Sequence, residues 1–339
     1  MYKTQRLNNF LEKAANKNQR FWRIVANISI VVAIGEMFFA EYVLTNNFLR
    51  FMYTPQVAQP VFPIIPGVTI NLRWFPYLLL AISLAITVHE VAHGIIASLE
   101  KIPVKSAGII LAPITFGGFV EPDEEKFKKA QLTSRLRVLS IGSLTNLAFG
   151  LLASLLIIGL FMPASGVLIG RVREDGPAYK AGIQAWDVIQ GINGVRIRDL
   201  YDMSLFMVSV KPGDLLLIGT SSGVREVISG VSPSNSSQGI IGVEGLSNYY
   251  PMWYGEFAPQ FSYNLYMVLN WLSLLMINLA IFNMMPLYPL DGEAYVYSLL
   301  KERMKRGLKE VRALVNIFSL ALIGLNFGMT FIKYGLIQI

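Results

Sequence analysis

Five apolar stretches, each long enough to cross a bilayer as a helix, constrain this chain more than any other feature. They lie near residues 24–44, 75–99, 138–162, 263–285 and 313–335. A helix needs about 20 apolar residues to span the roughly 30 Å hydrocarbon core of a membrane. Only 15% of the 339 residues are charged, against about 25% in soluble domains. The sequence therefore predicts an α-helical polytopic membrane protein and excludes a disordered chain, a coiled coil and an ordinary soluble enzyme.

The segment between the third and fourth apolar stretches has a different character. Residues 165–247 hold seven basic and eight acidic residues, with many Gly and Ser. Short β-branched runs alternate there with turn signals such as Asp175-Gly176 and Asn193-Gly194. Asn-Gly between apolar runs is typical of a β-hairpin. The sequence therefore predicts a small β-rich domain inserted between membrane helices.

Positive charge is distributed unevenly between the connecting segments. Three segments hold 19 of the 29 basic residues: 1–23, 100–137 and 288–312. The connections on the opposite side, 45–74 and 248–262, hold only two. Basic loops mark the cytoplasmic side of a membrane protein, so we expect the N-terminus and the three basic segments in the cytoplasm and the β-rich domain outside it. The net charge of +7 is then a marker of one side of the cell membrane, and no nucleic-acid partner is expected.

The chain has no cysteine, and its only two histidines stand in the pattern His89-Glu90-Val91-Ala92-His93, near the end of the second stretch. On a helix, positions i and i+4 share a face, so both imidazoles can bind one metal ion. Zinc suits such ligands, and the intervening Glu90 is then free to act as general base. Ionisable groups inside a membrane segment are functional by default, which favours a metal site over two structural histidines.

A catalytic zinc ion needs a third protein ligand, which must here be a carboxylate or a rarer donor. The candidates at membrane depth are Glu36, Glu41 and Asp291. Asp291 is preferred because Pro286 and Pro289 break the helix before it, and irregular backbone at membrane depth is tolerated only where it is buried in protein or lines a cavity. The other interpretation of Asp291 is an Asp-Gly pair at the tip of an ordinary turn.

Together, H-E-x-x-H in a membrane helix and N-x-x-P-x-x-x-L-D-G over residues 283–292 resemble the site-2 protease family of intramembrane zinc metalloproteases. The resemblance implies a core of three helices, here 75–99, 138–162 and 263–285. It also implies a role for five residues: zinc ligands His89, His93 and Asp291, general base Glu90, and substrate-holding Asn283. Relatives often open the third span with Gly-Pro-x-x-Asn, whereas Gly142-Ser143-Leu144-Thr145-Asn146 lacks the proline.

The run Ile114-Thr115-Phe116-Gly117-Gly118-Phe119-Val120 is similar to the membrane-associated β-loop that follows the H-E-x-x-H helix in this family. The resemblance implies that Gly117, Gly118 and Phe119 bind an unwound substrate by strand addition. Strand addition is favoured on physical grounds, because a helical substrate hides its scissile carbonyl and must unwind before cleavage. An ordinary amphipathic hairpin is the alternative, and both interpretations stay open.

The β-rich segment resembles a PDZ domain over the run from Asp175 to Gly194, with Trp186 at a position where relatives usually have Gly. PDZ domains bind extended peptides along a sheet edge. A domain without a ligand that acts as a steric filter is an equal alternative.

These observations predict an intramembrane zinc endopeptidase acting on a single-pass transmembrane protein within the lipid bilayer, with one Zn²⁺ per chain. The rivals are a non-enzymatic membrane protein that binds or transports metal, and another class of membrane H-E-x-x-H peptidase. We expect an anchor helix and an extended loop over residues 1–74, and the first part of the catalytic core over 75–162, with a membrane-associated loop at 106–125. The PDZ-like domain is expected over 165–247. The second part of the core, with the Asp-Gly motif, follows over 248–295, and a basic segment and the last span complete the chain over 296–339.

Overall fold

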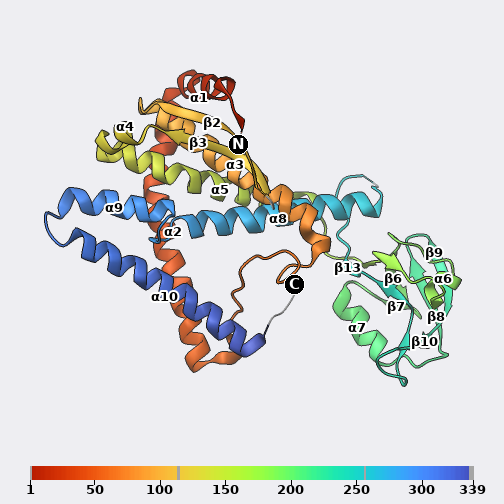
Figure 1. Cartoon of the computed structure of the whole chain (residues 1–339). Helices are drawn as coiled ribbons and strands as arrows, with labels where there is room; N and C mark the ends of the chain where they lie inside the picture. The colour runs from red at the N-terminus through yellow and green to blue at the C-terminus, as the bar shows by residue number, and fades with distance from the viewer. Residues whose placement is uncertain (1, 113–114, 256, 336–339) are drawn as a thin grey trace. The chain divides into compact units, whose positions relative to one another are not determined.

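A computed structural model describes residues 2–112, 115–255 and 257–335 of the chain (Figure 1). It divides into two compact units, one made of Met1–Ala153 with Trp271–Ile339 and the other of Ser154–Asn270. Helices α5 (Leu132–Leu160) and α8 (Pro259–Asn283) run from one unit into the other.

Within the described residues, five helices are long and apolar enough to cross a membrane. They are α2 (Gln19–Tyr53), α3 (Phe75–Leu99, preceded by the 3-10 turn Leu72–Trp74), α5, α8 and α10 (Leu308–Tyr334). The prediction of five apolar helices is confirmed. Three of them begin five or six residues earlier than expected, because polar residues such as Arg20 and Arg135 continue the helix beyond its apolar part.

The N-terminal segment, expected only as a basic stretch, forms strand β1 (Tyr2–Lys3) and helix α1 (Gln5–Lys17). Helix α1 packs on α3 through Leu11, which is fully buried. A Cβ on Gly94 of α3 would lie 2.6 Å from Leu11 Cδ1, so any larger residue at this position would displace the Leu11 side chain. Leu7, Leu11 and Ala14 stand at the spacing of one helix face, a signal for α1 that is not among the predictions made from the sequence.

Strands β2 (Val104–Ala112) and β3 (Thr115–Pro122) form an antiparallel hairpin, and β1 pairs with β2 to give a three-stranded sheet of order β1-β2-β3. The short helix α4 (Glu124–Lys129) follows. Most of the expected loop at 106–125 is therefore a hairpin, while Ile114 lies outside the described residues. Strand β3 contacts α3 through two hydrogen bonds, from the Gly118 N–H to Thr87 Oγ1 (3.0 Å) and from the Val120 N–H to Glu90 (3.1 Å).

Helix α8 ends at Asn283, and the chain then leaves helical structure over residues 284–290 before α9 (Asp291–Arg303) begins. This agrees with the helix-breaking effect expected of Pro286 and Pro289. Helix α9 is held at its centre by Tyr295, which is 1% exposed and donates a hydrogen bond from its hydroxyl to the Ile30 carbonyl of α2 (3.0 Å). The expected boundary between residues 295 and 296 thus falls inside α9.

Polar side chains line the contact between α10 and α2. Ser319 donates a hydrogen bond to Glu41 (2.6 Å), and Asn47 donates one to Asn326 (2.9 Å). Ser319 and Asn326 are seven residues apart and completely buried, so they lie on one face of α10. Among the described residues, neither carboxylate oxygen of the buried Glu36 has a hydrogen-bond partner.

The second unit contains the β-rich region that the sequence predicts. A six-stranded sheet has the order β13-β4-β6-β8-β9, with β7 paired to β6. Its strands are β4 (Val167–Leu168), β6 (Val188–Ile192), β7 (Val195–Arg196), β8 (Leu215–Thr220), β9 (Gly223–Ile228) and β13 (Ser247–Asn248). Four further short strands are β5 (Arg171–Val172), β10 (Gly230–Val231), β11 (Gly239–Ile240) and β12 (Val243–Glu244), and the helices are α6 (Pro177–Lys180) and α7 (Leu200–Val208).

Two local predictions in this unit are matched by the backbone. Asn193 (φ 50°) and Gly194 (φ 78°) join the antiparallel strands β6 and β7, which confirms the Asn-Gly hairpin. Trp186 has a φ of 74°, in the left-handed region where glycine is favoured, and its ring lies 5.9 Å from that of Tyr263. The resemblance of the whole unit to a PDZ domain stays a prediction.

Candidate metal centre

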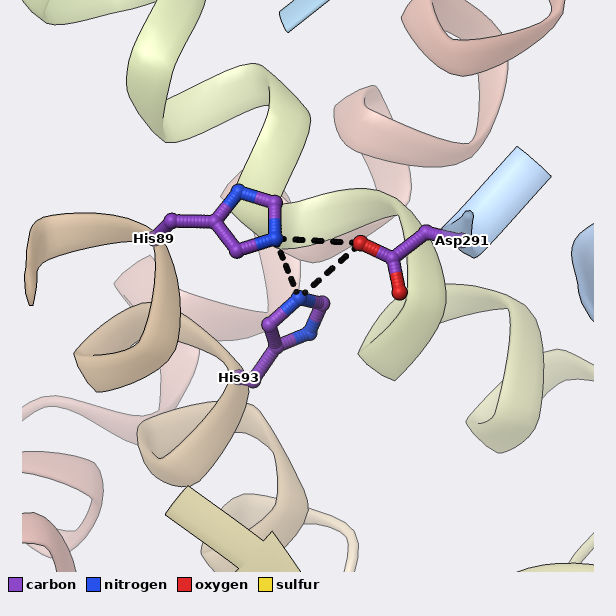
Figure 2. Close-up of side chains that lie close together, drawn as sticks. All are labelled: His89, His93 and Asp291. Carbon is purple, nitrogen blue, oxygen red and sulfur yellow. Dashed lines mark hydrogen bonds and ion pairs between the residues drawn. The ribbon is translucent and has the colours of Figure 1, made fainter. Parts of the chain in front are cut away.

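His89, His93 and Asp291 lie together in the first unit, although the second histidine and the aspartate are 198 positions apart in the sequence (Figure 2). The Nε2 atoms of the two histidines are 2.9 Å apart. Asp291 Oδ2 is 3.0 Å from His89 Nε2 and 3.3 Å from His93 Nε2. Among the described residues, these three side chains form a group whose ligand atoms lie close enough together to share one metal ion.

The donor set fits zinc. Two imidazole nitrogens and one carboxylate oxygen are ligands that Zn²⁺ takes at about 2.0–2.2 Å. Three donors separated by 2.9–3.3 Å leave a point about 2 Å from all of them, so one ion can contact all three. Both histidines are buried, with at most 9% of their surface exposed. The Asp291 carboxylate is partly buried, with 24% of its side chain exposed, and a bound cation supplies the positive charge that favours its ionised form there.

The carbonyl of Val138 on α5 fixes the orientation of His93. His93 Nδ1 lies 2.6 Å from that oxygen. A carbonyl can only accept a hydrogen bond, so Nδ1 carries the proton and Nε2 presents its lone pair to the site. Histidine ligands of metals are commonly held by such an outer hydrogen bond.

Two amides lie close to His89. Asn146 Nδ2 of α5 is 3.4 Å from His89 Nδ1, and the buried Asn146 Oδ1 has no hydrogen-bond partner among the described residues. The two ends of an amide are interchangeable by a half-turn, and with Oδ1 toward His89 this oxygen accepts a hydrogen bond from Nδ1–H. His89 Nε2 then faces Asp291 as an acceptor. Asn283 Nδ2, at the end of α8, is 3.4 Å from His89 Nε2, which places this predicted substrate-holding residue beside the site.

Gly142 lets α5 approach both histidines. A Cβ at this position would lie 2.5 Å from His89 Cε1 and 2.5 Å from His93 Nε2, distances that real Cβ atoms do not show. The relatives' proline after this glycine is absent here, yet Val138, Gly142 and Asn146 lie on one face of an unbroken helix at intervals of four residues. Val138, Gly142 and Asn146 are not among the site residues that the sequence predicts, although their i, i+4, i+8 spacing is the signal of one shared helix face.

Asp291 is the first residue of α9 and does not stand at the tip of an isolated turn. Gly292 makes this geometry possible, because a Cβ there would lie 2.1 Å from the Met284 carbonyl oxygen. The Asp-Gly pair therefore brings the start of α9 against the end of α8. Of the other carboxylates considered as ligands, Glu41 binds Ser319, and neither Glu36 nor Glu41 joins the cluster.

The remaining predicted residues lie along α3 and β3. Glu90 is half-buried and accepts the hydrogen bond from Val120 N–H. Gly117 and Gly118 are buried, and a Cβ on Gly117 would lie 2.9 Å from Ile86 Cγ2 of α3. Their lack of side chains therefore has a packing reason, the close approach of β3 to α3. Phe119, between them and Val120, is half-buried.

Comparison with known proteins decides the family. The model of peptidase family M50 matches residues 77–325, which is most of the chain. This chain belongs to peptidase family M50. The predicted resemblance to a family of membrane zinc metalloproteases is confirmed, and with it the prediction of a protease that uses zinc.

Relatives of this M50 protein have been named from several organisms. An uncharacterized protein of Methanocaldococcus jannaschii is 29% identical over 307 residues, which cover 88% of this chain and 78% of the relative. Proteins of Neisseria meningitidis and Clostridium acetobutylicum, each named "Putative zinc metalloprotease", are 26% identical over 177 and 171 residues. Each match covers 43% of this chain, and the chain covers 40% and 50% of these two relatives. The chain therefore matches half of their length or less.

The Gly142→Ala substitution tests the packing of α5 against the histidines. The added methyl group must displace an imidazole, and we expect zinc affinity to fall about 10–100-fold, the range for disturbing the outer contacts of a ligand. Competition with a chromophoric chelator in detergent measures this. Gly159→Ala in the same helix is the control, since nothing lies within 4 Å of its added Cβ, and it should bind zinc as the wild type does. Unchanged affinity in Gly142→Ala would contradict the site geometry.

Proposed function

We propose that this M50 protein is an intramembrane endopeptidase that cleaves the transmembrane segment of a single-pass membrane protein. The observation that carries the proposal is the group of buried His89, buried His93 and partly buried Asp291 in a chain whose described residues include five long apolar helices. We assign these three residues as the zinc ligands. Zinc, when bound, supplies Lewis-acid chemistry: it polarises the scissile carbonyl and acidifies a water molecule.

Glu90 is proposed as the general base. Glu90 follows the ligand His89 directly on α3. It is not one of the three proposed ligands, so its carboxylate is free to take a proton. It removes a proton from the attacking water and passes it to the leaving amine. The hydrogen bond from Val120 N–H holds one of its oxygens and leaves acceptor capacity on the carboxylate. Asn283, beside His89, is proposed to hold the substrate near the scissile bond.

The substrate must unwind before it is cleaved, because a helix hides its carbonyl groups. An unwound segment in a membrane needs partners for its backbone, and a strand edge supplies them. We propose that β3, at Gly117, Gly118 and Phe119, is that edge. Because Gly118 and Val120 donate their N–H groups to Thr87 and Glu90, pairing along this edge requires an exchange of these two hydrogen bonds.

The distribution of basic residues supports an orientation. We propose that the N-terminus and the segment between α9 and α10 face the cytoplasm, and that the β-rich unit lies outside it. The released fragment is then cytosolic. For the β-rich unit itself we propose a PDZ-like domain, and both peptide binding and steric filtering of substrates fit that fold.

Glu90→Gln tests the mechanism. The glutamine oxygen can still accept from Val120 N–H, so the fold and zinc content should be retained, while cleavage should fall at least about 10²–10⁴-fold, the usual contribution of a general base. Cleavage of a single-pass transmembrane peptide in proteoliposomes measures this, with the exposed Glu12→Gln as control. Full activity of Glu90→Gln would end the proposed mechanism. Metal flux without cleavage would favour the rival metal-transport function.

Cross-linking tests the substrate-binding edge. The chain has no cysteine, so Phe119→Cys introduces a single thiol. Neighbouring strands bring Cβ atoms within about 5.5 Å, which allows a disulfide with a substrate peptide that carries one cysteine near its cleavage site. Ile109→Cys on β2 is the control: strand β3 separates it from the proposed edge, so its Cβ lies about 10 Å from an added strand. Equal cross-linking of the two variants would exclude addition at β3.

Labelling of single cysteines tests the orientation. Ser237→Cys in the β-rich unit and Lys305→Cys between α9 and α10 both replace exposed residues. A membrane-impermeant thiol reagent applied to intact cells should label the first and spare the second. Lysed cells should show labelling of both. The reverse pattern in intact cells would invert the proposed topology.

A further inference from the structure

Asp291 is the ligand that depends most on contacts outside its own helix. His89 and His93 lie well inside the 25-residue helix α3. Asp291 instead begins a helix, directly after the non-helical segment 284–290. Helix ends fray, since few intrahelical hydrogen bonds hold them. A ligand at such an end keeps its place only if other elements hold the chain around it.

Helix α10 holds the chain on both sides of Asp291. Three residues before it, the N–H of Tyr288 donates a hydrogen bond to Asn316 Oδ1 (2.7 Å). Two residues after it, Glu293 receives two hydrogen bonds from Arg312, one from Nε and one from Nη2, the latter at 3.0 Å. Asn316 also donates to the Arg312 carbonyl (2.9 Å), so both contacts come from one turn of α10.

The Arg312–Glu293 pair is suited to fix the rotation of α9. Glu293 is 4% exposed and is held through both of its oxygens. The guanidinium also lies 4.4 Å from the centre of the Tyr297 ring, one turn further along α9. A planar guanidinium that donates two hydrogen bonds to one carboxylate and stacks on an aromatic ring fixes the orientation of α9 relative to Arg312. The ammonium group of a lysine cannot make this combination of contacts.

We propose that Arg312 is a positioning residue for the metal centre. Acting through Glu293, it sets the first turn of α9 so that Asp291 Oδ2 stays within reach of both histidine Nε2 atoms. This inference rests on the proposed zinc site. It assigns the start of the last membrane span a role in metal binding, although Arg312 itself is not a ligand.

The test measures zinc affinity in the full-length protein by chelator competition, together with the absorption spectrum of the cobalt-substituted form. Arg312→Lys keeps the charge and loses the two-point grip. Arg312→Met with Glu293→Gln removes both charges, so no unpaired buried charge is left to unfold the chain. Both variants should raise the zinc dissociation constant about 10–100-fold, as loss of outer-shell partners does, and should change the cobalt spectrum.

Glu302→Gln is the matched control. Glu302 binds Arg135 (2.5 Å) at the far end of the same helix, so this substitution weakens the docking of α9 away from Asp291. It should lower the unfolding temperature while zinc affinity and the cobalt spectrum stay at wild-type values. Wild-type zinc affinity and spectrum in both Arg312 variants would overturn the proposal, as would equal losses of zinc affinity in the control and the Arg312 variants. A wild-type chain that binds no zinc would overturn the proposed function as well.

Discussion

The convergence of one carboxylate and two imidazoles among apolar helices is the constraint on which the rest of this structure depends. Such groups are costly to remove from water, and partners for their polar atoms reduce that cost. Here the partners are close: the Val138 carbonyl holds His93, Asn146 lies beside His89, and Asp291 lies within 3.3 Å of both Nε2 atoms. The outer contacts thus direct the free donor atoms toward one point, which is the arrangement a metal ion requires.

Glycines make this convergence sterically possible. Gly142 brings α5 against the two imidazoles, Gly292 brings α9 against the end of α8, and Gly117 brings β3 against α3. Each contact leaves no room for a Cβ, so α3, α5, α8, α9 and β3 approach more closely than ordinary side chains allow. The hairpin in turn meets Glu90 through Val120 N–H, so the proposed base and the proposed substrate edge are joined by one hydrogen bond. In the proposed mechanism, a substrate strand that pairs with Val120 N–H would release the oxygen of Glu90 that this group holds.

The sequence predicts the parts of the site that depend on local spacing or on elimination. His89 and His93 share a helix face at i and i+4, and the absence of cysteine and of a third histidine directs the search to a carboxylate. The break before Asp291 follows from its two prolines. The five apolar helices and the Asn-Gly hairpin are predicted for the same reason, since their signals lie within a few turns of chain. By contrast, the contact of Arg312 with Glu293 depends on how α10 returns to α9, and no local pattern encodes that path.

Polar residues within apolar helices show where such reasoning reaches its limit. From sequence, Glu36, Glu41 and Asp291 are all carboxylates at membrane depth and all candidates for a zinc ligand. The structure separates them by their partners: Asp291 meets two imidazoles, whereas Glu41 meets a serine hydroxyl of α10. Hydrogen bonds between membrane helices contribute only about 0.6 kcal/mol on average, so a polar residue in a span can serve helix packing alone. An intramembrane carboxylate therefore indicates chemistry only when other ligand atoms converge on it, and in this chain they converge on Asp291.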